Sequence, residues 1–443
     1  MKHARWMAVV LTIACTLAGT TAVASAATTK PTATEVGVTA TTIRIAVVAD
    51  VDNSLAPGIF KGSVDGVKGW AKYTNAHGGL AGRKVVVDFI DSKLSADEST
   101  NAVIKACSQD FALVGTSAIF LNKLTDMEGC VNKAGAAIGI PDLAVVSTEV
   151  AQQCSKTTYA VNPPSLICST QNQHPQTYQA NVGRTFYYQT KFHKSLHGGY
   201  IYSGDLKSAE NANRGSMSEM QHAGKGIKAD YQQTVGATAP QPSYTPLVQQ
   251  LKDKSSNYAQ SGATFNSTVL LRREAKLQGV GPSGSGFIWD CTLQCYDKQL
   301  LKQGGADVND QYVSLLFLPF EEAHQNKTLA NFIKYTGPKL VTGFGIQAYA
   351  SGLVVSQAIK QIVKTAGVNG VTRQALFDQL NTIKSFNAGG MIATTNIADR
   401  KVSPCYVLTQ VKNGKFVRVT PSKKGTFNCK SQNYSTVKLD LLK

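Results

Sequence analysis

The chain has 443 residues and a basic composition, with 45 Lys and Arg against 28 Asp and Glu and a formal net charge of +17. This length is too great for one hydrophobic core and predicts two lobes of ordinary domain size. The basic residues are scattered, and no Lys/Arg run is interleaved with aromatic residues, so the charge does not indicate a nucleic-acid partner. An anionic cell envelope or an anionic ligand would suit this charge, and so would a role in solubility alone.

The first 26 residues have the layout of a secretory signal peptide. Lys2 and Arg5 precede a short apolar run, and Ala24-Ser25-Ala26 gives the small-x-small pattern that signal peptidase recognises. No stretch of the chain reaches the roughly 20 apolar residues that a membrane helix needs. We therefore expect an extracytoplasmic protein, in the periplasm or at the cell surface. Cys15 leaves open a second form, in which this cysteine carries a lipid anchor.

Eight cysteines follow the expected signal, an even number in a compartment where thiols oxidise. They allow about 105 connectivities, and we expect near neighbours to pair. The expected pairs are Cys107 with Cys130, Cys154 with Cys168, Cys291 with Cys295, and Cys405 with Cys429. A zinc site is disfavoured, because Cys291-x3-Cys295 has no second pair of ligands at finger spacing.

Residues 27–41 are rich in Thr, Ala and Pro without apolar periodicity, which predicts a flexible tether. From Thr42 onward, strand and helix patterns alternate. The sequence predicts strands at 43–49, 84–90 and 111–115, with helices at 62–75 and 96–107 between them. Strands that alternate with helices imply a parallel sheet with right-handed crossovers.

The alternation breaks over residues 148–178 and then resumes as a second parallel unit. Strands are expected at 199–203, 229–234, 267–271, 286–289 and 312–318, and helices up to Met220 and at 244–254, 272–279, 344–363 and 374–383. Two apolar stretches, 405–411 and 416–419, then flank Asn413-Gly414, which is a hairpin signal. The expected fold class is α/β with two parallel-sheet lobes.

Several of these segments resemble the leucine/isoleucine/valine-type solute-binding proteins of ABC importers. The resemblance spans roughly residues 36–398 and rests on Thr42-Ile43-Arg44-Ile45, Gly62-x-x-x-Gly66, Asn75-x-x-Gly78-Gly79-x-x-Gly82-Arg83-Lys84, Phe111-Ala112-Leu113-Val114-Gly115, Gly139-Ile140-Pro141, Phe344-x-x-Gln347-Ala348-Tyr349 and Gly389-Gly390. It implies a type I periplasmic-binding fold, in which two Rossmann-like lobes joined by three crossovers close on a small molecule. We expect lobe 1 to comprise residues 42–163 and 319–398, and lobe 2 residues 164–318 and 399–443.

Ligands of open parallel sheets bind beyond the carboxyl ends of the strands, so polar residues after each strand are candidate contacts. In lobe 1 these are Asp50, Asn53 and Ser54 after the first strand, Thr116 and Ser117 after the third, and Asp142 with Ser147-Thr148 after the fourth. The resemblance implies that Thr116 and Ser117 donate to a ligand carboxylate. Hydroxyl groups at such positions also cap helices, and both roles can coexist.

In lobe 2 the candidates are Asp205, Lys207 and Asp290. The resemblance implies that Asp290 pairs with a ligand ammonium, because a carboxylate in a desolvated cleft needs a cation. Alternatively, Asp290 caps the next helix or pairs with an internal Lys or Arg. Lys207 stands where amino-acid receptors of this family often have Tyr, and it would suit an anionic or amide ligand equally well.

These features predict a protein that binds a solute reversibly and does not catalyse a reaction. We expect a monomer, without cofactors, that holds a small polar ligand such as an amino acid or an amide and delivers it to an ABC-transporter permease in the membrane. A ligand sensor or scaffold of the same fold is the alternative, since it needs the same cleft. An enzyme is disfavoured, because nucleophile-elbow and metalloprotease motifs are lacking. Gly279-x-Gly281-x-x-Gly284 follows a helix instead of a strand, so it is not a dinucleotide site.

Overall fold

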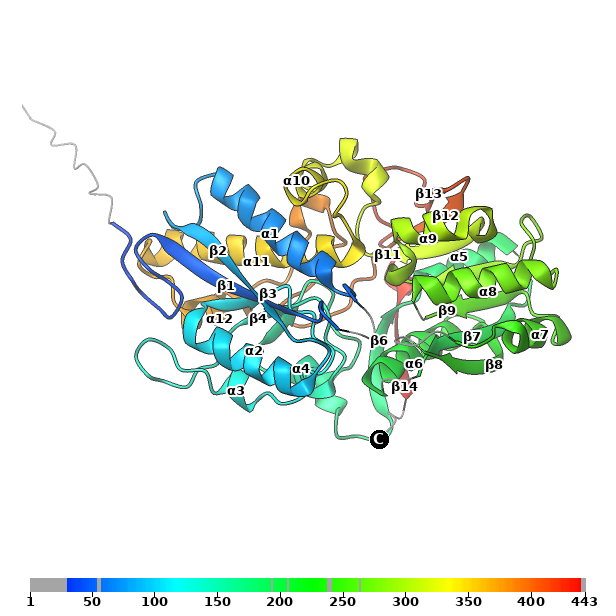
Figure 1. Ribbon diagram of the computed structural model, residues 1–443, viewed down its shortest axis with the longest axis horizontal. Coiled ribbons are helices and arrows are strands. Elements are labelled where there is room, and N and C mark those ends of the chain that lie inside the picture. The colour runs from blue at the N-terminus through cyan, green and yellow to red at the C-terminus, as the bar shows by residue number, and fades with distance from the viewer. Residues whose placement is uncertain are drawn as a thin grey trace, which may run out of the picture.

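The computed structural model describes residues 30–53, 57–192, 194–204, 207–236, 241–262 and 264–439, without the side chains of residues 208, 209, 212, 216 and 219. The expected signal peptide, Cys15, Ser54 and Asp205 lie outside these residues. Two α/β lobes lie side by side, each built on its own sheet (Figure 1). We call the five-stranded sheet with its helices lobe 1 and the seven-stranded sheet with its helices lobe 2.

Lobe 1 has a parallel sheet of strand order β2-β1-β3-β4-β5. Its strands are β1 (Thr42–Ala49), β2 (Lys84–Asp91), β3 (Ala112–Val114), β4 (Asp142–Ala144) and β5 (Thr158–Ala160). Its helices are α1 (Lys61–Ala76), α2 (Ala96–Gln109), α3 (Thr125–Glu128), α4 (Val150–Cys154), α10 (Lys327–Thr336), α11 (Gly343–Ala366) and α12 (Arg373–Leu380). The expected alternation of strand and helix up to β3 is confirmed.

The motif Gly62-x-x-x-Gly66 lets α1 pack closely against α11. A Cβ atom at residue 66 would come within 2.1 Å of the carbonyl oxygen of Gly345, so only glycine permits this approach. One turn further on, the buried Trp70 donates from Nε1 to Ser356 Oγ at 2.9 Å. The close approach of Gly66 to Gly345 and the hydrogen bond from Trp70 to Ser356 hold α11 against α1.

Lobe 2 has a sheet of order β13-β12-β11-β10-β9-β7-β8, parallel from β11 to β8 and antiparallel at β12 and β13. Its strands are β7 (His197–Ser203), β8 (Lys228–Val235), β9 (Tyr258–Ser261), β10 (Ile288–Cys291), β11 (Gln311–Leu315), β12 (Val407–Lys412) and β13 (Lys415–Thr420). Its helices are α5 (Gly183–Phe192), α6 (Lys207–His222), α7 (Thr245–Asp253), α8 (Phe265–Leu277) and α9 (Lys298–Gly304). The expected hairpin is confirmed, with Asn413 and Gly414 both at positive φ in its turn.

The strand expected at 267–271 is wrong, because these residues lie inside α8. Thr264 caps this helix by accepting a hydrogen bond from the backbone N–H of Ser267 at 3.3 Å. The true strand is β9, whose four residues are all buried. A short apolar run fits a buried strand and a buried helix turn equally well, so periodicity alone could not separate them.

The described part of the expected tether, residues 30–41, packs on lobe 1. The backbone N–H of Thr32 donates to Asn369 Oδ1 at 2.8 Å. The carboxylate of the buried Glu35 accepts from the backbone N–H of Arg373 at 3.2 Å. Polar hydrogen bonds hold most of this segment, and hydrophobic periodicity does not detect such contacts.

Three segments connect the lobes. The first includes β6 (Gln176–Asn181), which pairs antiparallel with β14 (Tyr434–Leu439) between the two large sheets (Figure 1). The other two run beside each other, and the backbone N–H of Leu318 donates to the carbonyl of Met391 at 3.0 Å. Adjacent connecting segments of this kind form a hinge that can absorb rotation of one lobe against the other.

The structure contains four disulfides, and they join the neighbours that the sequence favoured: Cys107–Cys130, Cys154–Cys168, Cys291–Cys295 and Cys405–Cys429. Three of them close loops with separations of 14 to 24 residues, whereas Cys291–Cys295 spans a separation of only 4. Within the described ranges, no helix has both the length and the apolar character needed to cross a bilayer.

Candidate binding site between the lobes

A cavity of about 640 Å³ lies between the lobes. Both sheets contribute to it through the loops at the carboxyl ends of their strands, and the connecting segments close one side. Its polar lining residues include Asn122, Ser147, Thr148, Glu149, Gln153, Asn162, Ser165, Asn181, Arg184, Lys207, Asn211, Thr292, Gln294, Ser314 and Gln347. The volume falls within the range of about 300–1,000 Å³ that is usual for small-molecule sites.

Uncharged amide and hydroxyl groups predominate on these walls. Among the described lining residues the charged ones are Glu149, Arg184 and Lys207. Apolar side chains such as Leu293 and Phe317 complete the cavity. The combination offers many hydrogen-bonding groups and little net charge.

Asp290 lies behind the cavity wall instead of within it. Its buried carboxylate accepts hydrogen bonds from the hydroxyls of Tyr188 at 2.7 Å and Tyr258 at 2.8 Å, and its Oδ2 lies 3.2 Å from Arg184 Nε. Burial raises the pKa of Asp290, while the charge of Arg184 and the two tyrosine hydrogen bonds oppose this shift. Pairing with an internal Arg, the alternative reading of this residue, is therefore what the structure contains.

Arg184 connects this buried cluster to the cavity. It lies near the start of α5, lines the cavity, and has a side chain only 8% exposed. Asp290 can therefore influence the site through Arg184, without a direct ligand contact.

Asp50 is also buried away from the cavity. Its Oδ1 accepts from Ser92 Oγ at 2.6 Å and from the backbone N–H of Leu94 at 2.8 Å, and its Oδ2 accepts from the backbone N–H of Ile119 at 2.8 Å. These bonds tie together the segments that follow β1, β2 and β3. Asn53, three residues later, does not line the cavity either.

Thr116 and Ser117 are fully buried in the sheet edge of lobe 1. The hydroxyl of Ser117 lies 2.8 Å from that of Ser63 on α1. Both residues belong to the hydrogen-bonded continuation of β3, since the backbone N–H of Ser117 donates to the carbonyl of Val48. Ser117 links the end of β3 to α1, and neither Thr116 nor Ser117 lines the cavity.

Asp142 is buried inside β4. Its Oδ2 accepts from Gln152 Nε2 at 3.2 Å and from Thr158 Oγ1 at 3.1 Å. Burial raises the pKa of this carboxyl to about 6, against the effect of these hydrogen bonds. The loop that follows the strand does reach the cavity, through Ser147 and Thr148.

Among the described candidates Asp50, Asn53, Thr116, Ser117, Asp142, Lys207 and Asp290, Lys207 alone lines the cavity. It begins α6 and is exposed. The structure thus brings together Lys207 and the loop at Ser147-Thr148, which come from opposite lobes.

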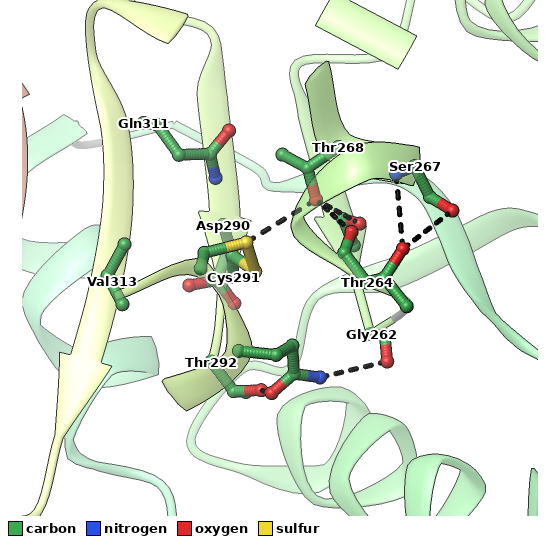
Figure 2. Close-up of a disulfide and its surroundings, with 12 residues drawn as sticks. Gly262, Thr264, Ser267, Thr268, Asp290, Cys291, Thr292, Gln311 and Val313 are labelled. Carbon is green, nitrogen blue, oxygen red and sulfur yellow. Dashed lines mark hydrogen bonds between the residues drawn. A yellow bond between two sulfur atoms is a disulfide. The ribbon is translucent and has the colours of Figure 1, made fainter. Parts of the chain in front are cut away.

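Sequence reasoning missed the loop Thr292–Gln294, which lines the cavity directly after β10. The disulfide Cys291–Cys295 closes this loop (Figure 2). Gln294 Nε2 donates to the carbonyl of Gly262 at 2.9 Å, and the Thr292 hydroxyl donates to Gln294 Oε1. A Cys-x3-Cys pattern immediately after a strand was the available signal, because a closed loop of this size holds its side chains in place.

The fold and the shared cavity define a two-lobed binding protein with type I periplasmic-binding architecture. Residues 42–415 match the family described as periplasmic binding protein, and the chain belongs to that family. It has no match among curated proteins.

Solved structures of three proteins share the fold. They are a fatty acid ABC transporter substrate-binding protein from Thermomonospora curvata (14% identity, TM-score 0.67, 90% of this chain and 95% of that one), an ABC transporter substrate binding protein from Aeropyrum pernix (15%, 0.65, 88% and 97%) and a leucine binding protein from Thermotoga maritima (13%, 0.62, 85% and 98%).

Proposed function

We propose that this chain is the solute-binding protein of an ABC importer, which captures a small polar solute outside the cytoplasm, such as an amino acid or an amide. The observation that supports this proposal is the cavity shared by both lobes and lined mainly by neutral hydrogen-bonding groups. A solute that contacts both lobes binds the closed form more tightly than the open form, and this difference in affinity shifts the population toward closure. Lys207, Thr292 and Gln294 are candidate contacts on lobe 2.

The proposal is tested by thermal unfolding of the mature protein with amino acids, amides, short peptides, sugars, polyols and small anions. A ligand at 100 times its Kd adds about 2.7 kcal/mol of stability, which should raise Tm by several degrees. Ser147→Trp should abolish the shift, because the indole would occupy the cavity. Ser108→Trp on the exposed surface of α2 is the matched control. A shift that survives Ser147→Trp would place the ligand elsewhere.

Delivery to a permease is a separate part of the proposal. The ligand-loaded protein should stimulate ATP hydrolysis by its permease complex in proteoliposomes, and the ligand-free protein should not. A protein that binds a solute and leaves ATP hydrolysis unchanged would favour the sensor or scaffold alternative.

A further inference from the structure

A second cavity, of about 200 Å³, adjoins the cleft on the side of lobe 2. It lies at the carboxyl ends of β7, β9 and β10, and α6 covers it through Asn213 and Met217. Thr292 and Gln294 line both cavities, so a ligand in the cleft can extend past them. The space is somewhat larger than a cavity of about 150 Å³ that accommodates benzene. We call it the side pocket.

The side pocket is neutral. None of its described lining residues carries a charge, and its walls combine the apolar Ile201 and Met217 with the polar Tyr202, Asn213 and Gln260. A charged ligand group would lose its hydration here without gaining a counter-charge. An uncharged group with an apolar stem and a polar tip matches the walls.

Gln260 supplies the strongest observation. It lies in β9 and is only 5% exposed, yet its side-chain amide has no hydrogen-bond partner among the described residues. The neighbouring Gln294 differs, because its amide donates to the carbonyl of Gly262 and accepts from Thr292. The amide atoms of Gln260 are not among the buried side-chain atoms that lack a partner, so they are accessible from the open space of the side pocket. A group that enters the side pocket can therefore hydrogen-bond to the donor and the acceptor of Gln260.

We propose that the side pocket binds an uncharged, hydrogen-bonding end of the solute, a carboxamide or a hydroxyl on a short apolar stem, and that Gln260 is its direct partner. This inference rests on the proposed function and narrows it, since the end of the solute that enters lobe 2 carries neither a carboxylate nor an ammonium. The cleft cavity holds the remainder of the solute.

Small probes test this pocket by NMR of the 15N-labelled mature protein. Acetamide should shift the Gln260 side-chain amide and the Gly262 backbone amide in a saturable way, whereas acetate and methylammonium should not. Gln311 is the internal control, because its amide already donates to the carbonyl of Trp289 at 2.9 Å. Equal or tighter binding of acetate or methylammonium at these signals would overturn the proposal, and so would an absence of any acetamide shift.

Two variants extend the test. Gln260→Leu preserves side-chain size and should weaken acetamide binding, followed at Gly262, about ten-fold. Gly262→Ala keeps Gln260 but narrows the pocket, because the new Cβ would lie 2.7 Å from Asn213 Oδ1. It should also suppress the acetamide shift, and binding that is unchanged in both variants would refute the pocket. If a solute still stabilises the wild type while acetamide leaves Gln260 unmoved, the side pocket is refuted and the proposed function stands.

Discussion

Leu293 of lobe 2 lies directly against Gly343 of lobe 1. A Cβ atom at residue 343 would come within 2.2 Å of Leu293 Cδ1. Gly343 is the first residue of α11, after the N-cap Thr342, and Leu293 lies in the loop closed by Cys291–Cys295. The missing side chain at residue 343 therefore lets the two lobes meet at one edge of the cleft.

We expect Gly343→Ala to hold the lobes apart. Relief of the overlap with Leu293 should cost the closed form about 1–3 kcal/mol, which lowers ligand affinity roughly 5- to 150-fold. X-ray scattering and calorimetric titration of the liganded protein would measure both effects. Adding Leu293→Ala should restore affinity, and Gly215→Ala is the control because its new Cβ makes only an ordinary 3.4 Å contact. Full closure and unchanged affinity in Gly343→Ala would contradict this role.

Asp290→Asn should destabilise the ligand-free protein. It removes the buried negative charge beside Arg184 and should cost about 3 kcal/mol, measured by urea unfolding. The double variant Asp290→Leu/Arg184→Met should lose less than the sum of its single changes, because no buried charge of this pair remains. A variant with normal stability would contradict this structural role of Asp290.

Asp142 should make stability depend on pH. Its pKa is raised to about 6, so the folded protein binds this proton more tightly than the unfolded chain. The resulting stabilisation is present at low pH and is lost as pH rises from about 4 to about 6.

Asp142→Asn should remove this pH dependence. Relative to wild type, the free energy of unfolding of the variant should rise by up to about 3 kcal/mol as the pH increases from 4 to 7. Urea unfolding across this range would measure the difference. Asp378→Asn on the exposed surface of α12 is the control. Ligand affinity should be unchanged in Asp142→Asn. A difference in unfolding free energy between wild type and variant that stays constant with pH would be inconsistent with the raised pKa of Asp142.

Removal of the Cys291–Cys295 disulfide should affect binding more than stability. Its loop is so short that loop-closure entropy contributes only about 2 kcal/mol, against about 3.5 kcal/mol for Cys405–Cys429. Replacing both Cys291 and Cys295 by Ser should nevertheless lower ligand affinity, because Thr292 and Gln294 lose their fixed positions. The matched variant replaces both Cys405 and Cys429 by Ser. Calorimetric titration would compare the ligand affinity of the two variants, and urea unfolding would compare their stability. The prediction fails if loss of Cys405–Cys429 weakens binding equally.

Much of the fold was predictable because strand and helix patterns differ clearly where one face is buried. The strand at Thr42, the helix with Gly62 and Gly66, and the hairpin at Asn413-Gly414 are all local signals. The strand β9 was missed, since its sequence Tyr258–Ser261 is short and half polar. Its identity depends on the neighbouring strands that bury it.

The candidate site was only partly predictable. The rule that ligands bind at the carboxyl ends of strands located the loops at Ser147-Thr148 and Lys207. It could not tell which side chains face the cavity. The expected strand ended at Trp289, whereas β10 continues to Cys291. Successive strand residues point to opposite faces, so this small difference moves Asp290 from the site into the core.

The pairing of β14 with β6 has a practical consequence for recombinant work. Val437 stands opposite Tyr178 and Ser435 opposite Ala180, and Tyr178 and Ala180 both line the cleft. A protein shortened before residue 434 would lose the strand that braces this wall. Its solute-binding defect would then resemble that of a variant with a substitution in the binding cleft, although every cleft residue was still present.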